Sequence, residues 1–284
     1  MSTSTSARFT LGALEFERPV VMGILNVTPD SFSDGGRFDE PARALAAAAA
    51  MVEAGAGIVD IGGESTRPGA PAVDEAAEID RVVPVVEMVA TQLDVAVSVD
   101  TSKPGVMRAA VAAGAAMIND VRALAEPGAL DAAAGLGVPV CLMHMQGEPR
   151  TMQEDPRYAD VVGEVLAFLE ERVAACEAAG IPRASIVLDP GFGFGKTVEH
   201  NVALLRNLRQ FTVLGMPVLA GLSRKSTLGA LTGRPVEERV AASVAAAAIA
   251  VVNGASIVRV HDVAASVDAV RVAGAVAEGS GRRP

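Results

Sequence analysis

The chain has 284 residues, half of them hydrophobic and 20% charged, with a formal net charge of −10 at pH 7 and one tyrosine, eight phenylalanines and no tryptophan. An acidic chain repels phosphate backbones, and so few aromatic rings leave little surface on which bases stack, so nucleic acid is not expected as a partner. A small anionic substrate remains compatible with this charge, provided that a few basic residues converge in one place.

The first twelve residues, MSTSTSARFTLG, lack a charged stretch followed by an apolar one, and we find no apolar run of membrane-spanning length without polar residues. We therefore expect no membrane association. The two cysteines, Cys141 and Cys176, provide neither a disulfide framework nor a zinc site. A reducing cytoplasm is the expected location.

Residues 8–19 (RFTLGALEFERP) are predicted to form a short N-terminal β-hairpin that plugs the bottom of a barrel. Beyond it, apolar runs rich in Val and Ile alternate with Ala-, Leu-, Glu- and Arg-rich stretches at helical spacing. This alternation is typical of parallel strands covered by helices. The runs are PVVMGILN, GIVDIG, VAVSVD, AAMIND, VPVCLMH, SIVLDP, MPVLAGLS and SIVRVHD.

Eight such units predict an α/β fold, a (β/α)8 TIM barrel, with a doubly wound sheet as the alternative. We find no linker or shift in composition that would divide the chain, so residues 1–284 are expected to form one domain. The last residues, 276–284, are expected to be a frayed tail.

Each apolar run ends on polar residues, which would form one ring because all strands of such a barrel point the same way. Taken singly, each is equally explained as a turn residue, a helix cap or part of a salt bridge on the rim. The ring consists of Asn26, Asp60, Asp100, Asn119, His144, Asp189, Ser223 with Arg224 and Lys225, and Arg259 with His261.

The ring is chemically divided. Acceptors and an amide, from Asp100, Asn119 and Asp189, suit the N–H-rich edge of a flat heterocycle. The cations suit an anion such as a diphosphate, and they are Lys225, Arg259, His261 and Arg67. Asp60 and Glu64 form a tempting carboxylate pair, but we expect them to hold loop geometry. His144 is as readily a satisfied histidine of the rim as a residue of the site.

Two polar loops, residues 26–36 (NVTPDSFSDGG) and 62–71 (GGESTRPGAP), have the composition of mobile lids. Phe32 in the first loop is either a buried anchor or a wall for a ring-shaped substrate.

The segment DPGFGFGKT, residues 189–197, superficially matches a phosphate-binding P-loop. In a P-loop the first glycine stands five positions before the Gly-Lys pair, where this chain has Pro190. Proline has no N–H to donate, which argues against that interpretation.

Eight segments resemble, in order and spacing, the bacterial dihydropteroate synthase family from about Val20 to Asp262. They are GILNVTPDSFSDGG, DIGGESTRPGA, SVDTSKP, MINDVRALAEPGAL, VCLMHMQGEPRTMQ, LDPGFGFGKT, GLSRKST and IVRVHDV. The resemblance implies a TIM barrel, usually a homodimer, that joins 4-aminobenzoate to a dihydropterin methyl diphosphate with Mg²⁺. The products would be 7,8-dihydropteroate and diphosphate.

The resemblance also implies roles for individual residues. The metal would contact Asn26, and the pterin ring would contact Asp100, Asn119, Asp189 and Lys225. The diphosphate would be bound by Thr66, Arg259 and His261, and the aminobenzoate by Phe32, Arg67, Pro68, Phe194, Lys225 and Ser226. The residues expected to take part directly in catalysis are Asp30, Arg67, Asp100 and Lys225.

A dissociative path is expected, because the reduced pterin can delocalise a developing cation. Asp30 is the candidate for orienting the attacking amine. Backbone N–H groups near Ser226 suit a carboxylate, although Ser226 is equally explained as a helix cap.

Two other functions are alternatives to the synthase. One is methyl transfer from methyltetrahydrofolate to a corrinoid, which needs no diphosphate site. The other is a paralogue that binds pterin without catalysis, and such a protein should have lost some of the loop residues.

Overall fold

The structure, a computed structural model, describes residues 8–17, 19–28, 40–65, 72–148 and 151–279. Its centre is a sheet of eight parallel strands in the order β8-β7-β6-β5-β4-β3-β10-β9. The strands are β3 (Val20–Asn26), β4 (Ile58–Gly62), β5 (Ala96–Asp100), β6 (Met117–Asp120), β7 (Val140–Met143), β8 (Ile186–Asp189), β9 (Leu219–Ala220) and β10 (Ile257–Val260).

A bridge between Leu188 and Val218 joins the two outer strands of this sheet, and the Leu188 N–H donates to the Pro217 carbonyl at 3.0 Å. The ring is thereby closed, and the predicted (β/α)8 barrel is confirmed. The strand expected over MPVLAGLS is only two residues long, and the chain leaves the sheet at Gly221.

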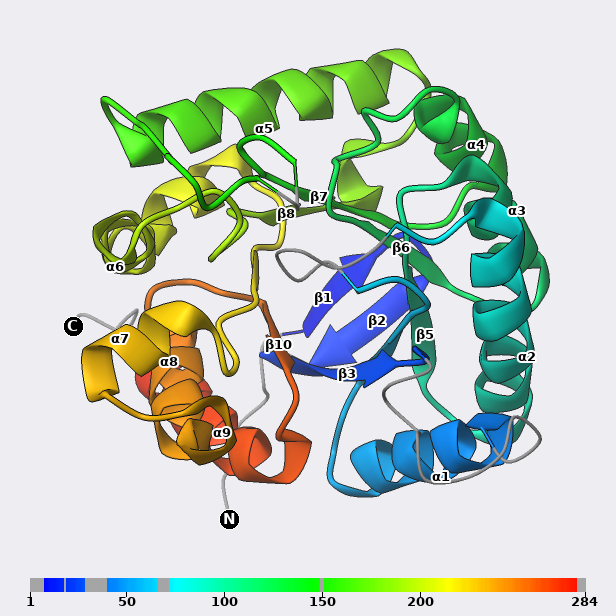
Figure 1. The fold of residues 1–284 in the computed structure, drawn as a ribbon, viewed down its shortest axis with the longest axis horizontal. Helices are drawn as coiled ribbons and strands as arrows, with labels where there is room; N and C mark the ends of the chain where they lie inside the picture. Colours follow the sequence, from blue (N-terminus) through cyan, green and yellow to red (C-terminus); the bar gives the residue numbers. More distant parts are fainter. Residues whose placement is uncertain (1–7, 18, 29–39, 66–71, 149–150, 280–284) are drawn as a thin grey trace.

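Helices surround the ring on its outer side (Figure 1). They cover the outward faces of the strands, which explains why the strands are apolar runs rather than alternating patterns. The helices are α1 (Glu40–Glu53), α2 (Glu75–Gln92), α3 (Pro104–Ala112), α4 (Ala129–Leu136), α5 (Val161–Ala178), α6 (Val198–Arg206), α7 (Ser226–Thr232), α8 (Val240–Val252) and α9 (Val263–Gly279), with 3₁₀ turns η2 (Arg183–Ser185), η3 (Leu208–Leu214) and η4 (Val236–Glu238).

The predicted N-terminal hairpin consists of β1 (Arg8–Leu11) and β2 (Leu14–Glu17), which pair antiparallel. Phe9 and Leu11 are buried against an apolar layer formed by the beginnings of the barrel strands. That layer consists of Val20, Met22, Ile58, Met117, Cys141, Val187, Leu219 and Ile257. The hairpin therefore closes the bottom of the barrel, as expected.

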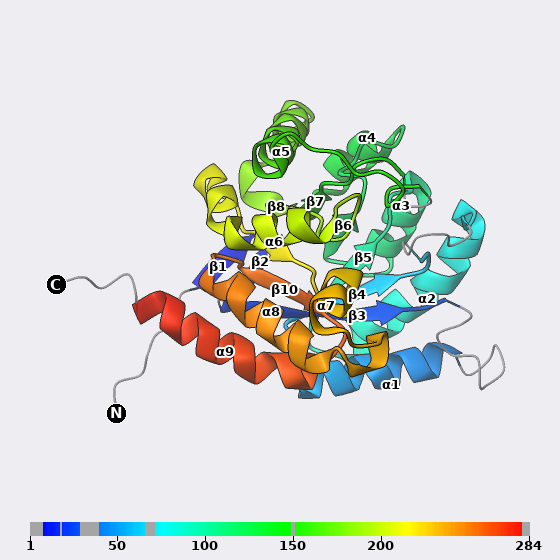
Figure 2. The same cartoon turned by 60° about the vertical axis from the view of Figure 1, so that its left-hand side comes forward.

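Helices α8 and α9 pack side by side on the outside of the barrel (Figure 2). The last helix continues to Gly279, so residues 276–279 are helical rather than part of a frayed tail. Residues 280–284 lie outside the described part. Within the described residues, no helix is long and apolar enough to cross a membrane.

Candidate active site

Side chains in a strand point alternately inward and outward, so the residue two positions beyond an inward apolar residue also points inward. In four strands, the inward-facing residue of the apolar bottom layer is followed two positions later by an inward-facing polar residue of an upper layer. The four pairs are Ile58 and Asp60, Met117 and Asn119, Val187 and Asp189, and Ile257 and Arg259. Asp100 ends β5 and pairs in register with Asn119 of β6.

Arg259 lies at the centre of one side of this layer. Its Nε donates to Asp60 Oδ2 at 2.6 Å, and its Nη2 donates to Asp100 Oδ2 at 2.7 Å. Asn119 Nδ2 donates to the same oxygen of Asp60 at 3.0 Å. Asp60 is fully buried, and among the described residues its other oxygen, Oδ1, has no hydrogen-bond partner. One carboxylate therefore orients both an arginine and an asparagine of the ring.

Burial and the neighbouring charges change the acidity of Asp100. Burial raises the pKa of Asp100 to about 7, because the nearby Arg259 offsets only part of this cost and the charges of Asp60, Asp120 and Glu78 add to it. Burial by itself lowers the pKa of Arg259, but Asp60 and Asp100 raise it above its usual value. The arginine is therefore always charged, while Asp100 titrates near neutral pH.

The glycine-rich segment after β8 folds back toward the end of β7. Asp189 Oδ1 accepts from the Gly191 N–H at 2.7 Å. Gly191 has a φ of 70°, and a Cβ at this position would overlap the carbonyl oxygen of His144. Gly195, with a φ of 62°, approaches the backbone of Gln146 in the same way. The glycines thus permit close packing of two loops.

Lys196 is buried under this segment rather than exposed to a phosphate. Its Nζ lies 2.9 Å from His144 Nδ1 and donates to the carbonyls of Phe194 at 2.9 Å and His144 at 3.3 Å. Burial lowers the pKa of Lys196 to about 7, and burial beside Lys196 lowers the pKa of His144 to about 3. The side chain ties the glycine-rich loop to the end of β7, which confirms that the segment is not a P-loop.

Lys225 is presented by a strained turn after β9. The preceding residue, Arg224, has a φ of 57° and is held by Asp262, which accepts from Arg224 Nε at 2.9 Å. Lys225 Nζ donates to the Phe192 carbonyl and lies 4.4 Å from the centre of the Phe194 ring. Burial lowers the pKa of Lys225 to about 8.

Three further predicted residues lie at the rim. His261 Nδ1 is 3.0 Å from Ser223 Oγ, whose oxygen also accepts from the His261 N–H at 3.2 Å. Asn26 is half-buried at the end of β3, where it pairs in register with Gly62. Ser226 is exposed at the first position of α7, where Lys225, not Ser226, occupies the cap position and makes no side-chain cap bond.

This geometry can be compared with that of known proteins. A model of the pterin-binding enzyme family matches residues 22–261. The dihydropteroate synthase of Haemophilus influenzae is 55% identical over 259 residues, which cover 91% of this chain and 94% of that protein. The chain belongs to the dihydropteroate synthase family. These enzymes are transferases that condense a dihydropterin methyl diphosphate with 4-aminobenzoate in folate biosynthesis.

Solved structures of dihydropteroate synthases superimpose closely. The Xanthomonas albilineans enzyme with 4-aminobenzoic acid has a TM-score of 0.89 and 56% identity, and covers 96% of this chain and 98% of that one. The same enzyme in complex with 7,8-dihydropteroate has a TM-score of 0.85 and 53% identity, and covers 95% and 98%. The sequence-based resemblance to dihydropteroate synthases is confirmed.

The barrel brings together most of the site residues that the sequence predicts. They divide between two sides: Asp100, Asn119 and Arg259 on one, and Asp189, Phe194 and Lys225 on the other, with Asn26, Ser226 and His261 at the rim. Five predicted residues fall outside the described residues, and they are Asp30, Phe32, Thr66, Arg67 and Pro68.

Sequence reasoning missed two residues that contact the predicted site residues or the loop that carries one of them. Asp60 was expected to hold loop geometry, but it contacts Arg259 and Asn119 inside the barrel. The signal was present, because Asp60 stands two residues beyond Ile58 in an otherwise apolar strand, on its inward face. The other is Lys196, whose buried partners come from two loops and could not be foreseen from the local pattern.

Proposed function

We propose that this chain binds the dihydropterin in the polar upper layer of the barrel. The pterin would lie between the side that carries Asp100 and Asn119 and the side that carries Asp189 and Lys225. Support comes from the placement of acceptors and donors around one space: carboxylates from Asp100 and Asp189, an amide from Asn119 and an ammonium from Lys225. A carboxylate facing two parallel N–H groups forms a bidentate, charge-assisted pair. This convergence of side chains from different strands is the observation that carries the proposal.

The reaction breaks the bond between the methylene carbon and a diphosphate oxygen, so negative charge grows on the leaving group. Arg259 and His261 would stabilise that charge, and Thr66 would join them. The electron-rich pterin delocalises the cation that remains, and the carboxylates of Asp100 and Asp189 lower its energy. We therefore propose a dissociative path. Asp60 would position Arg259 for this role by holding its Nε.

The aminobenzoate would lie over the loops that follow β8 and β9. Lys225 above the Phe194 ring forms a cationic and aromatic surface suited to a benzoate. Backbone N–H groups beside Ser226 would bind the carboxylate, and Phe32, Arg67 and Pro68 would complete the pocket. The uncharged aryl amine would attack the methylene carbon as a nucleophile. Asp30 would orient the amine and accept its proton after the attack.

Magnesium is the cofactor that we propose, with Asn26 as its protein ligand. The amide oxygen of Asn26 is a hard donor, and it lies beside Gly62 at the top of the barrel, 3.8 Å from where a Cβ of that residue would stand. Mg²⁺ is commonly held by one or two protein oxygens together with substrate phosphates and waters, so a single asparagine fits it. The described residues contain no cluster of three His, Cys, Asp or Glu side chains that could bind a metal without the substrate. When bound, the ion would neutralise charge on the diphosphate.

The proposed assembly is a homodimer through the outer face of α8 and α9. Four apolar side chains are exposed there: Ile249, Val252, Val272 and Val276. Together with small residues they line a shallow groove of about 510 Å³. A contiguous apolar patch of this kind marks an interaction surface, and the family suggests a second copy as its occupant. Val272→Asp should yield monomers in sedimentation, whereas Leu231→Asp, an exposed apolar residue on α7, should not.

The cytoplasm is the proposed location, supported by two buried cysteines that form no disulfide, Cys141 and Cys176. The proposed partners are the two small-molecule substrates, and we propose that neither nucleic acid nor a membrane is bound.

The deciding experiment supplies the dihydropterin methyl diphosphate and Mg²⁺, with and without 4-aminobenzoate, and measures diphosphate release and dihydropteroate. Product that appears only with both substrates is the expected result. Tight binding of the pterin diphosphate without product would instead identify a silent paralogue. The absence of binding would overturn the proposal.

A further inference from the structure

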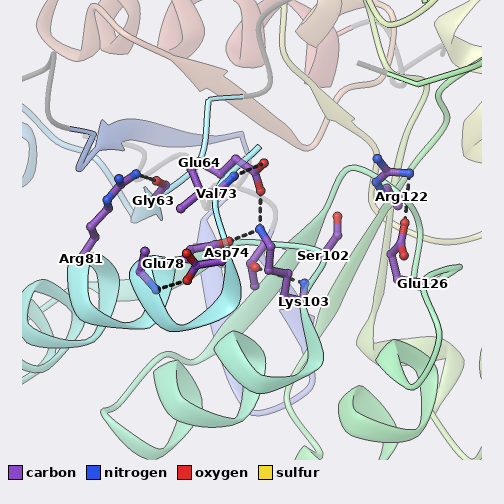
Figure 3. A network of polar contacts seen from close by, with 12 residues as sticks. Gly63, Glu64, Val73, Asp74, Glu78, Arg81, Ser102, Lys103, Arg122 and Glu126 are labelled. Carbon is purple, nitrogen blue, oxygen red and sulfur yellow. Dashed lines mark hydrogen bonds and ion pairs between the residues drawn. The ribbon is translucent and has the colours of Figure 1, made fainter. Parts of the chain in front are cut away.

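Outside the ring, an ion-pair cluster joins three segments of the chain next to the barrel mouth (Figure 3). Lys103, at the start of α3, donates to Glu64 after β4 and to Glu78 of α2. Glu78 is fully buried, and Glu64 and Lys103 retain side-chain exposures of 30% and 25%. One cation therefore serves two carboxylates in a partly buried position, where screening by water is weak.

The cluster holds both ends of the segment between residues 63 and 74. At its beginning, the Gly63 carbonyl accepts from Arg81 Nη1 at 3.0 Å, and a Cβ at Gly63 would collide with side chains of α2. At its end, the Val73 N–H donates to Glu64 Oε1 at 3.2 Å, and Asp74 caps α2 by accepting from the Ala77 N–H at 2.8 Å. Glu64 thus bonds across the segment and to Lys103 at once.

Lys103 also connects this segment to the ring. It stands three residues after Asp100, and its own N–H donates to Thr101 Oγ1 at 3.2 Å. Helices α2 and α3 are further joined where Glu75 Oε2 accepts from the Gly105 N–H at 2.8 Å. The strand end that carries Asp100 and the base of the 63–74 segment are therefore fixed against each other.

We propose that Glu64, Lys103 and Glu78 are positioning residues that set the affinity of the site for 4-aminobenzoate. This inference rests on the proposed function, in which Arg67 and Pro68, between Glu64 and Val73 in the sequence, contact that substrate. Misplacing a binding group by about 1 Å through a change away from the chemistry can cost up to about a hundredfold in rate. None of the three residues needs to touch a substrate.

Burial by itself lowers the pKa of Lys103, but its hydrogen bonds to the two carboxylates raise it above the ordinary value. Lys103 thus stays charged across the working pH range. Lys103→Met would leave two unneutralised carboxylates, one of them buried, and would weaken the whole barrel. Glu64→Gln is the better variant, because its amide oxygen can still accept from Val73 while the negative charge is lost.

For Glu64→Gln we expect the KM for 4-aminobenzoate to rise about tenfold. The Kd of 6-hydroxymethyl-7,8-dihydropterin, a pterin without the diphosphate, should change by less than about twofold, because Asp100 and Asn119 are untouched. Lys103→Arg, which keeps the charge, should stay near the wild type. The matched control is Glu177→Gln, which removes an exposed ion pair with Arg183.

Amide exchange provides a readout that does not depend on activity. In Glu64→Ala the Val73 N–H should lose its protection, while amides in β5 keep theirs. An unchanged Val73 amide, an unchanged KM for 4-aminobenzoate, or an equal loss of pterin affinity would overturn the proposal. If the wild type forms no dihydropteroate, the proposed function fails, but the Val73 measurement still tests the cluster.

Discussion

On the side of the barrel mouth formed by β4, β5, β6 and β10, two carboxylates share one guanidinium. On the side formed by the ends of β8 and β9, two lysines surround one carboxylate, Asp189. Burial acts in opposite directions on these two groups: it raises the pKa of Asp100 to about 7 and lowers the pKa of Lys196 to about 7 and of Lys225 to about 8. The same desolvation thus brings the titration of a carboxyl and of two amines close to neutral pH from opposite directions.

The first side should be the more fragile, because two carboxylates there depend on a single cation for their ion pairs. Arg259→Gln leaves Asp60 and Asp100 buried without their cation, which costs about 3 to 5 kcal/mol of unfolding free energy. The same variant removes a donor to the leaving group, and we expect dihydropteroate formation to fall by about 10² to 10³. Urea unfolding and a product assay measure the two effects.

Arg183→Gln is the matched control for this variant. It breaks an exposed ion pair with Glu177, at the other end of the barrel, and should cost less than about 1 kcal/mol. Equal unfolding midpoints for Arg259→Gln and the wild type would show that the buried pairs contribute no net stability.

Asp60→Asn removes one of the two negative charges from the first side and should cost about 1 to 3 kcal/mol through a weakened bond to Arg259. After burial and Arg259, Asp60 is the next largest influence on Asp100, and it raises the pKa of that carboxyl. Its removal should therefore lower the pKa of Asp100. If the ionised Asp100 binds the pterin, the acid limb of the pH–rate profile moves to lower pH; a shift to higher pH would contradict this assignment.

On the side formed by the ends of β8 and β9, the buried Lys196 should make the stability of the fold depend on pH. The pKa of Lys196 is lowered from 10.5 to about 7, so between these values the unfolded chain binds a proton that the folded chain does not. Stability should therefore rise with pH in this window, by up to about 1.4 kcal/mol per unit. Lys196→Met removes the titrating group, and unfolding in urea between pH 7 and 8, below the main titration of the cysteines, should then lose this slope. A slope that persists in Lys196→Met would assign it to another group.

The two sides also differ in how far the sequence predicts them. Asp100, Asn119 and Arg259 follow from strand periodicity, because each stands on the inward face of an apolar strand. The contacts of Lys196 and the strained φ of Arg224 depend on loops that meet only in the folded barrel. Local pattern specifies which face a side chain occupies, but not which distant backbone carbonyl it reaches.

The threonine of the GKT sequence, Thr197, distinguishes two interpretations of the glycine-rich loop, a P-loop and a loop that ends in a helix cap. In this chain Thr197 caps α6: its Oγ1 accepts from the His200 N–H at 3.2 Å, and His200 Nδ1 accepts from the Thr197 N–H at 3.2 Å. Thr197→Ala should therefore cost about 1 kcal/mol in unfolding free energy. Catalysis should not change, because Lys196 is held by His144 and Phe194 rather than by the cap.

Thr197→Ser tests this last point, since it keeps the hydroxyl and the cap. Both variants should form dihydropteroate at the wild-type rate, with only Thr197→Ala less stable. If Thr197→Ala lost activity under conditions where it remains folded, while Thr197→Ser kept it, the hydroxyl would have to contact a substrate or its metal. The glycine-rich loop would then share the phosphate chemistry of a P-loop, despite the proline at its start and the buried lysine that precedes the threonine.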